Sequence, residues 1–160
     1  MPTNTYIALA TITLASTDSE IVFGSIPATY RDLVVVINIP SLTGSPTARG
    51  GYISLNSTGL SSVYMTGNGS SASAGTDATD GIAAFANAHG VYTFQIMDYS
   101  ATDKHKTVLT RASIGSTAVW AIASRYASNS AVTSVSFTAP DSGSDLFAIG
   151  STFSLYGIAS

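Results

Sequence analysis

Apolar side chains recur at every second position along most of this chain, and this spacing constrains the fold more than any other feature. Runs such as Tyr52–Asn56 and Thr152–Ile158 alternate apolar with polar residues. A period of two places successive side chains on opposite faces of a β-strand. Glycine, proline, asparagine and aspartate, which are typical turn residues, bound most of the runs. The pattern therefore predicts an all-β fold.

Ten strands are predicted in the 160 residues, at a spacing typical of an antiparallel sandwich or barrel. They are Tyr6–Leu14, Glu20–Ser25, Leu33–Ile39, Tyr52–Asn56, Val63–Thr66, Val91–Tyr99, Lys106–Ile114, Val119–Tyr126, Val132–Ala139 and Thr152–Ile158. A chain of this length fits one domain with its own core, and it has no cysteine with which to form disulfides.

The run Leu33–Ile39, LVVVINI, is too apolar for a strand with one wet face. We expect it to be a central strand that is covered on both sides or lies at a subunit contact. A short buried helix is the alternative, but seven residues are few for a helix, and valine and isoleucine favour a pleated sheet.

The strands are expected to form a β-sandwich domain over residues 6–160, preceded by an N-terminal arm at residues 1–5. Residues 67–81, GNGSSASAGTDATDG, are of low complexity and predict a long mobile loop. No lysine or arginine precedes the first apolar run, so it does not resemble a secretory signal. No run approaches the roughly 18 apolar residues of a membrane span, so no membrane partner is expected.

Charged residues make up 9% of the chain, against about 25% in an average soluble domain. Serine, threonine, glycine and alanine take their place. A neutral surface suits a protein that is packed into an assembly or displayed outside a cell. The formal net charge of −3 argues against nucleic acid as a partner, because phosphate binding needs basic groups.

Catalytic chemistry has little support in the residues. A serine hydrolase needs a nucleophile, a base and an orienting group, yet neither His89 nor His105 lies in a motif and no G-x-S-x-G occurs. Both histidines are expected at loops or strand ends. A glycosidase would need paired carboxylates; Asp98 and Asp103 flank a hairpin, where neutralisation by nearby basic residues such as Lys104 is the expected role. We predict that the protein is not an enzyme.

Metal and cofactor sites are not expected either. Asp77 and Asp80, or Asp98 and Asp103 with His105, could approach one another. However, the calcium-loop pattern with its closing glutamate is absent, and aspartate in such loops mostly forms local turns. No phosphate-binding glycine loop occurs.

A ligand or subunit surface could use exposed aromatic side chains. The candidates for such an interface or ligand surface are Tyr52, Tyr64, Tyr99 and Tyr126. Tyrosine in sheets also serves ordinary cross-strand packing. Trp120 lies in an apolar run and is assigned to the core.

The segment Ile26–Leu33, IPATYRDL, links two predicted strands and predicts a structural corner. Pro27 fixes the backbone and ends the first strand. Tyr30 is expected to pack back onto the core. Arg31 and Asp32 are adjacent opposite charges that should point outward and form the turn.

Two segments carry a family resemblance. The chain resembles tailed-bacteriophage virion proteins that pair an IP-x-x-Y-x-D-L corner with a C-terminal GS-x-x-x-LYG. The matching segments are Ile26–Leu33 and Gly150–Gly157. Gly51–Asn56 and the hairpin around Asp98 are similar in layout. The resemblance implies a jelly-roll β-sandwich that assembles as a homotrimer, and it carries over no catalytic residue.

Relatives of this kind include capsid decoration (cement) proteins, head fibres and tail-fibre modules. The chain contains no fibre shaft, so the resemblance favours a cement protein on the capsid exterior. Its partner would be the phage major capsid protein, whose assembled shell it would bind and stabilise. The alternative is a receptor-binding module of a phage tail or head fibre that recognises host glycan.

Overall fold

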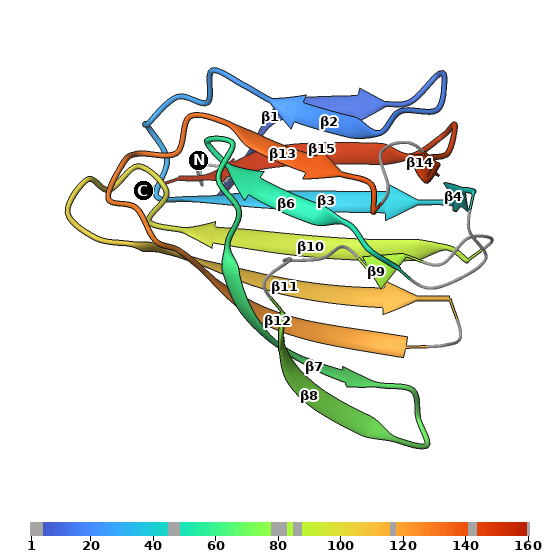
Figure 1. The fold of residues 1–160 in the computed structure, drawn as a ribbon. Helices are drawn as coiled ribbons and strands as arrows, with labels where there is room; N and C mark the ends of the chain where they lie inside the picture. Colours follow the sequence, from blue (N-terminus) through green and yellow to red (C-terminus); the bar gives the residue numbers. More distant parts are fainter. Residues whose placement is uncertain are drawn as a thin grey trace.

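A computed structural model describes residues 5–44, 49–77, 83–84, 88–115, 118–140 and 144–159. Within these residues every regular element is a β-strand. The strands form one large and one small antiparallel sheet that pack face to face (Figure 1). The predicted all-β sandwich is therefore confirmed.

The large sheet has eight strands in the order β1-β15-β3-β10-β11-β12-β7-β8. Their bounds are β1 Tyr6–Thr13, β15 Thr152–Ile158, β3 Asp32–Ile39, β10 Gly90–Met97, β11 Lys106–Ile114, β12 Ala118–Tyr126, β7 Ser61–Gly67 and β8 Ala72–Asp77. The LVVVINI run thus lies inside the sheet, in β3 between β15 and β10. Its inward side is buried, whereas Val36 on the outward side is 37% exposed.

The small sheet has three strands in the order β2-β13-β6. Their bounds are β2 Glu20–Phe23, β13 Val135–Thr138 and β6 Tyr52–Leu55. Four two-residue strands form two further pairs: β14 (Leu146–Phe147) with β4 (Leu42–Thr43), and β5 (Arg49–Gly50) with β9 (Ala83–Ala84).

The order in which strands pair is that of a jelly roll. The pairs are nested along the sequence. The first strand, β1, pairs with the last, β15; further inward from both ends β2 pairs with β13, and after them β3 pairs with β10. Successive pairs alternate between the two sheets, as in a long antiparallel ribbon that is rolled up. The first and last described residues consequently meet, and Ala159 N–H donates to the Thr5 carbonyl at 2.9 Å.

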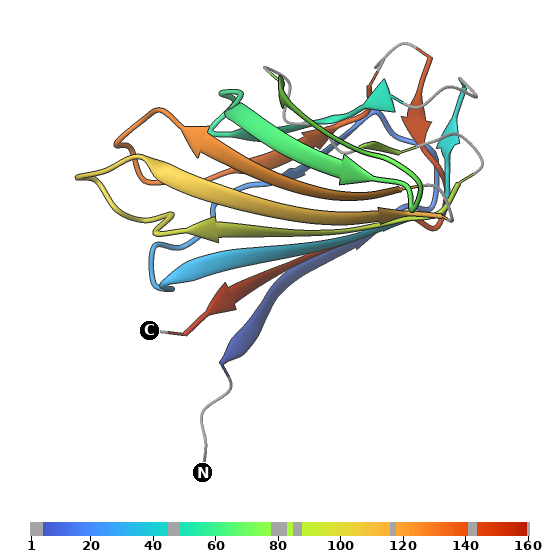
Figure 2. The same ribbon diagram turned by 90° about the horizontal axis from the view of Figure 1, so that it is seen from below.

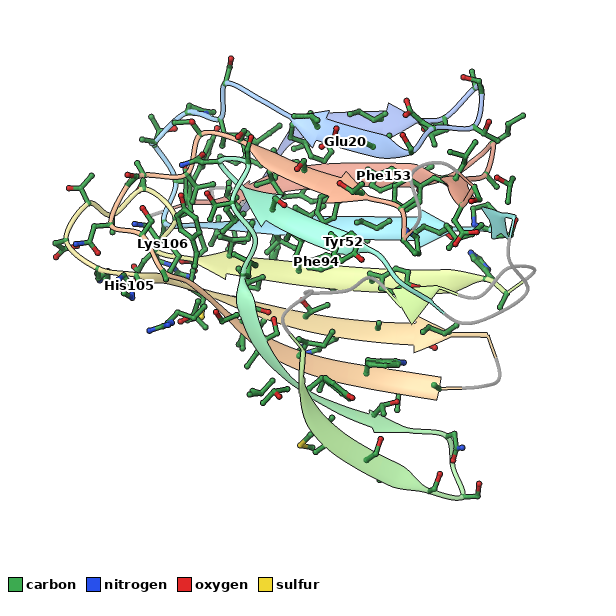
Figure 3. The ribbon with its side chains drawn as sticks, in the orientation of Figure 1. Glu20, Tyr52, Phe94, His105, Lys106 and Phe153 are labelled. Atoms are coloured by element: carbon green, nitrogen blue, oxygen red, sulfur yellow. The ribbon has the colours of Figure 1, made fainter. Side chains whose placement is uncertain are left out.

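The core lies between the small sheet and the part of the large sheet that faces it. Phe137 of β13 contacts Phe94 of β10, with ring centres 5.1 Å apart, and Phe153 of β15, with ring centres 6.0 Å apart. Phe94 and Phe153 point toward the small sheet in Figure 3. All three rings are buried. Burying a phenylalanine of this kind contributes about 1.5–3 kcal/mol.

The two sheets differ greatly in width. Three strands cover part of the eight-stranded sheet, while β11, β12, β7 and β8 extend past the small sheet (Figure 1). Seen from below, the large sheet forms one long curved layer with β1 beside β15 at one margin (Figure 2). The outer face of this layer is the broad surface of the molecule.

All ten predicted strands are present. The bounds of β11 and β15 match the prediction at both ends, β13 is shorter than predicted, and β7 is longer.

The predicted loop at residues 67–81 is wrong in part, because Ala72–Asp77 form strand β8 against β7. Asn68 turns the chain between them: its Oδ1 accepts the N–H of Ser70 at 3.1 Å and of Ser71 at 2.8 Å. Residues 78–82 lie outside the described part of the chain, as do residues 1–4 of the predicted arm. Thr5, the last residue of the predicted arm, is hydrogen-bonded to Ala159 at the end of the large sheet.

Candidate interaction surface

The corner Ile26–Leu33 packs directly against the C-terminal strand. The ring of Tyr30 lies on Gly157, so closely that a Cβ placed on that glycine would be 2.4 Å from Tyr30 Cγ. Arg31 N–H donates to the Ile158 carbonyl at 2.9 Å. The two segments that carry the family resemblance therefore meet at this contact. Tyr30 is half-buried and packs against the core.

Tyr99 binds the corner through two hydrogen bonds of its hydroxyl. It is fully buried, and its hydroxyl donates to the Pro27 carbonyl and accepts the Tyr30 N–H at 3.3 Å. Burial raises the pKa of the Tyr99 hydroxyl. Tyr99 is thus part of the corner's interior.

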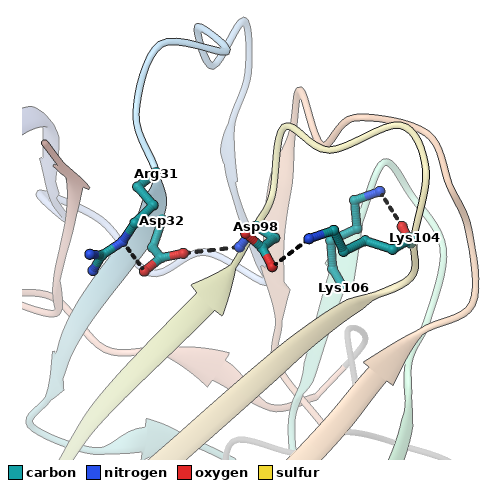
Figure 4. A network of polar contacts seen from close by, with 5 residues as sticks. All are labelled: Arg31, Asp32, Asp98, Lys104 and Lys106. Atoms are coloured by element: carbon teal, nitrogen blue, oxygen red, sulfur yellow. Dashed lines mark hydrogen bonds and ion pairs between the residues drawn. The ribbon is translucent and has the colours of Figure 1, made fainter. Parts of the chain in front are cut away.

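A chain of polar contacts runs from the corner to the β10–β11 hairpin (Figure 4). Arg31 Nε lies 3.0 Å from Asp32 Oδ2, and Asp98 N–H donates to Asp32 Oδ1 at 2.9 Å. Asp98 in turn pairs with Lys104, whose Nζ lies 3.2 Å from Asp98 Oδ2. Both members of that last pair are half-exposed, so it contributes little to stability.

The expectation that Asp32 points outward is wrong. The residue is 5% exposed, and its carboxylate accepts the N–H of Asp98, whose own backbone has a positive φ of 50°. Arg31 does point outward, with 60% of its side chain exposed.

Lys106, at the start of β11, is fully buried. Its Nζ donates to the Lys104 carbonyl at 2.9 Å and to the Ser128 carbonyl at 3.3 Å. Burial lowers the pKa of this ammonium, and the nearby Asp103 acts in the opposite direction. The side chain joins two loops at one end of the sandwich, near His105 (Figure 3).

The four tyrosines proposed as an interface or ligand surface do not come together. Tyr99 and Tyr126 are buried, at 0% and 3% exposure, so both are corrected to core residues. The Tyr126 hydroxyl accepts from Asn56 Nδ2 at 3.4 Å. Tyr52 is half-buried in β6 of the small sheet, and Tyr64 is half-buried in β7 of the large one.

Trp120 and the histidines occupy separate places. The half-buried Trp120 packs against the core, with its ring centre 5.4 Å from that of Tyr64. His89 precedes β10, where Nε2 contacts Asn38 Oδ1. His105 precedes β11 and is exposed. Among the described residues no three histidine or carboxylate side chains are grouped as a metal would require.

The outer face of the eight-stranded sheet gathers most of the exposed apolar side chains. Eleven large hydrophobic side chains are exposed among the described residues, and eight of them point outward from this sheet. The eight are Tyr6, Val36, Val63, Met65, Val91, Met97, Leu109 and Val119. We call this surface the outer sheet face. Exposed apolar side chains that gather on one face mark an interaction site more often than those scattered singly over a surface.

Strand register shows how continuous the outer sheet face is. One row of directly paired residues crosses all eight strands: Thr11, Ser154, Val36, Thr93, Arg111, Ala121, Met65 and Ala74. Among the described side chains of this face, the exposed charges are Arg111 and Arg125. The face thus mixes apolar side chains with serine and threonine, and its exposed charges are basic on a chain of net negative charge.

Sequence reasoning missed the outer sheet face, although a signal was present. In β10 the inward Tyr92, Phe94 and Ile96 are flanked by Val91 and Met97, which point outward. Apolar residues on both faces of a strand other than β3 indicate that both faces of the sheet are covered.

Comparison with protein-family models, with curated proteins and with solved structures finds no match to this chain. No helix among the described residues is long and apolar enough to span a membrane.

Proposed function

We propose that the chain is a structural protein of a tailed-bacteriophage particle: a capsid decoration (cement) protein that binds the exterior of the assembled shell as a homotrimer. The outer sheet face carries this proposal. Eight exposed apolar side chains on one face are costly to leave in water. A low charge over the whole chain points the same way, toward a protein that works when packed against others.

The family resemblance is the second support. Its two sharp segments are far apart in the sequence, but they meet where Tyr30 lies on Gly157. One packing contact thus gives a physical reason for the two patterns to occur together. The resemblance is the basis for proposing a phage particle, and the outer sheet face is the surface through which we propose that the chain attaches to it.

The mechanism is thermodynamic. A protein that binds the assembled shell but not dispersed subunits shifts the equilibrium toward the shell by mass action. Occupancy a hundred times above the dissociation constant stabilises each site by about 2.7 kcal/mol. Many copies together would resist the pressure of packaged DNA.

Host-glycan recognition by a tail or head fibre is less well supported. Two of its four tyrosines are buried, and the other two lie on different sheets. A glycan array with the isolated chain is the direct test of that alternative, and strong selective binding there would favour it over shell attachment.

The test of the proposed function uses capsids of the encoding phage prepared without this chain. Added chain should sediment with the capsids and raise the temperature at which they open. In solution, light scattering should give three times the chain mass of 16.3 kDa. No binding to capsids, with no change in opening temperature, would contradict the proposal.

A further inference from the structure

We infer that the outer sheet face binds a different protein through an apolar trough over β12, β7 and β8, and that this partner supplies carboxylates to Arg111 and Arg125. The inference rests on the proposed function and adds to it: the partner surface would be an apolar, acidic patch of the shell subunit. Three observations lead to it, namely the shape of the trough, the sign of its charges and the width of the face.

Three adjoining hollows form the trough. The first is lined by Val63, Met65 and Leu109, with Ala121 and Ala123 below them. The second continues along the same strands, and the residues that extend it are Gly67, Ala72 and Val119. The third continues toward Ser61, Thr76 and Arg125. In the first two hollows alanines lie between large apolar side chains, so an apolar ridge on a partner can enter there, whereas serine and threonine line most of the third.

The charges on this face have one sign. Arg111 lies at the first hollow and Arg125 at the third. Both are exposed. Arginine presents a planar fork that pairs with a carboxylate through two hydrogen bonds. A partner with carboxylates beside an apolar ridge therefore matches both properties of the trough.

The size of the face also fits a specific interface. Eight strands at a spacing of about 4.8 Å, each about seven residues long, span on the order of 800 Å². A standard stable interface buries about 800 Å² on each partner. The whole outer sheet face, of which the trough is a part, therefore has about the area of one side of such an interface.

A second copy of this chain is a poor occupant. If two outer sheet faces stacked, the interface would hold four arginines and no exposed acidic side chain from the described residues, and like charges in an interface are costly. The small sheet of another copy has only three strands to set against eight. The observations thus favour a different protein.

A matched pair of variants tests the face. Val63 in β7 is 54% exposed on the outer sheet face, and Val22 in β2 is 52% exposed on the small sheet. Val63→Glu should weaken capsid binding on the order of a hundredfold, because the interface would bury an unpaired charge. Val22→Glu should bind as the wild type does. The two variants should melt at similar temperatures.

A second pair tests the charge without altering the packing. Arg111→Gln and Lys104→Gln each remove one positive charge, on the outer sheet face and at the hairpin respectively. Arg111→Gln should weaken binding about tenfold at low salt and reduce its salt dependence. Lys104→Gln should leave both unchanged. Equal effects of the two substitutions would contradict the assignment of Arg111.

Separated capsids and tails distinguish the inference from the proposed function. If Val63→Glu binds capsids as strongly as the wild type does, the inference is overturned while the proposed function stands. Binding to tails alone, lost in Val63→Glu and kept in Val22→Glu, would overturn the proposed function while the outer sheet face stands. Binding to neither preparation would contradict both.

Discussion

The contact between Tyr30 and Gly157 joins the corner at Ile26–Leu33 to the C-terminal strand β15. Because the tyrosine ring occupies the space of a Cβ, only glycine fits at position 157 without a shift of the corner. The backbone there is ordinary strand in β15, so the requirement is steric and not conformational.

Gly157→Ala should therefore lower the free energy of unfolding by about 1–3 kcal/mol, the usual cost of overpacking. Urea denaturation measures it. Gly24→Ala is the control, since nothing lies within 4 Å of a Cβ there, and it should change stability by less than about 0.5 kcal/mol. In a Tyr30→Ala background the cost of Gly157→Ala should fall. If Gly157→Ala lowers the free energy of unfolding equally in the wild type and in the Tyr30→Ala background, the contact is contradicted.

The buried Tyr92 makes stability depend on alkaline pH. Burial raises the pKa of its hydroxyl far above the usual value, so the folded state keeps a proton that the unfolded state releases above about pH 10. The stabilising contribution is complete below that pH and is lost as the pH rises further. Lys106, whose pKa burial lowers, has the opposite slope.

Denaturant unfolding between pH 8 and pH 11 tests this dependence. The wild type should lose stability across the upper part of the range, and Tyr92→Phe should lose less. The difference between the two proteins isolates the tyrosine from Lys106 and from Tyr99. A difference that is constant with pH would contradict the assignment.

Strand β8 shows pairing without large side chains. Its residues, ASAGTD, contribute no large apolar group, so backbone hydrogen bonds to β7 and the Asn68 turn must stabilise it. Asn68 N–H donates to the Ser71 carbonyl at 3.1 Å. The alternation of an antiparallel ladder then directs the Ser73 N–H toward β7 and the Ala74 N–H away from it.

Proline substitutions at these two positions should differ accordingly. Ser73→Pro should remove a ladder hydrogen bond and expose the amides of β7 to hydrogen exchange, whereas Ala74→Pro should leave most of that protection. Amide exchange followed by NMR gives the comparison. Similar loss of protection in both variants would show that the register is different.

The strands that could be predicted from the sequence are those whose alternation is unmistakable. Thr152–Ile158 alternates Phe153 and Leu155 with polar neighbours, and both of its ends were predicted correctly. β8 could not be predicted, because its small residues are those of a loop. The buried Asp32 is bonded to the distant Asp98, and a contact across 66 residues leaves no local signal in the sequence.

The candidate site was harder to predict than the fold. Tyr99 and Tyr126 were proposed as surface residues because tyrosine tolerates both environments, yet both are buried. Val63 and Met65 belong to a predicted strand, β7. Which face of that strand is exposed depends on how far the small sheet extends across the large one, and it does not reach β7. That mismatch in width is a property of the whole topology.

At the scale of the whole molecule, the two sheets are unequal and the charge is low. A three-stranded sheet cannot cover an eight-stranded one, and the outer sheet face carries eight exposed apolar side chains and two exposed arginines. A freely diffusing protein would place more charge there. The arrangement suits a molecule whose broad face is covered by another protein.

Electron microscopy of the intact phage particle tests this account most directly, since it places the domain and its orientation in one experiment. We expect three copies of the sandwich grouped on the capsid exterior, with β12, β7 and β8 against the shell and the small sheet toward solvent. Sandwiches found on the tail or a fibre, or on the capsid with the outer sheet face toward solvent, would contradict it.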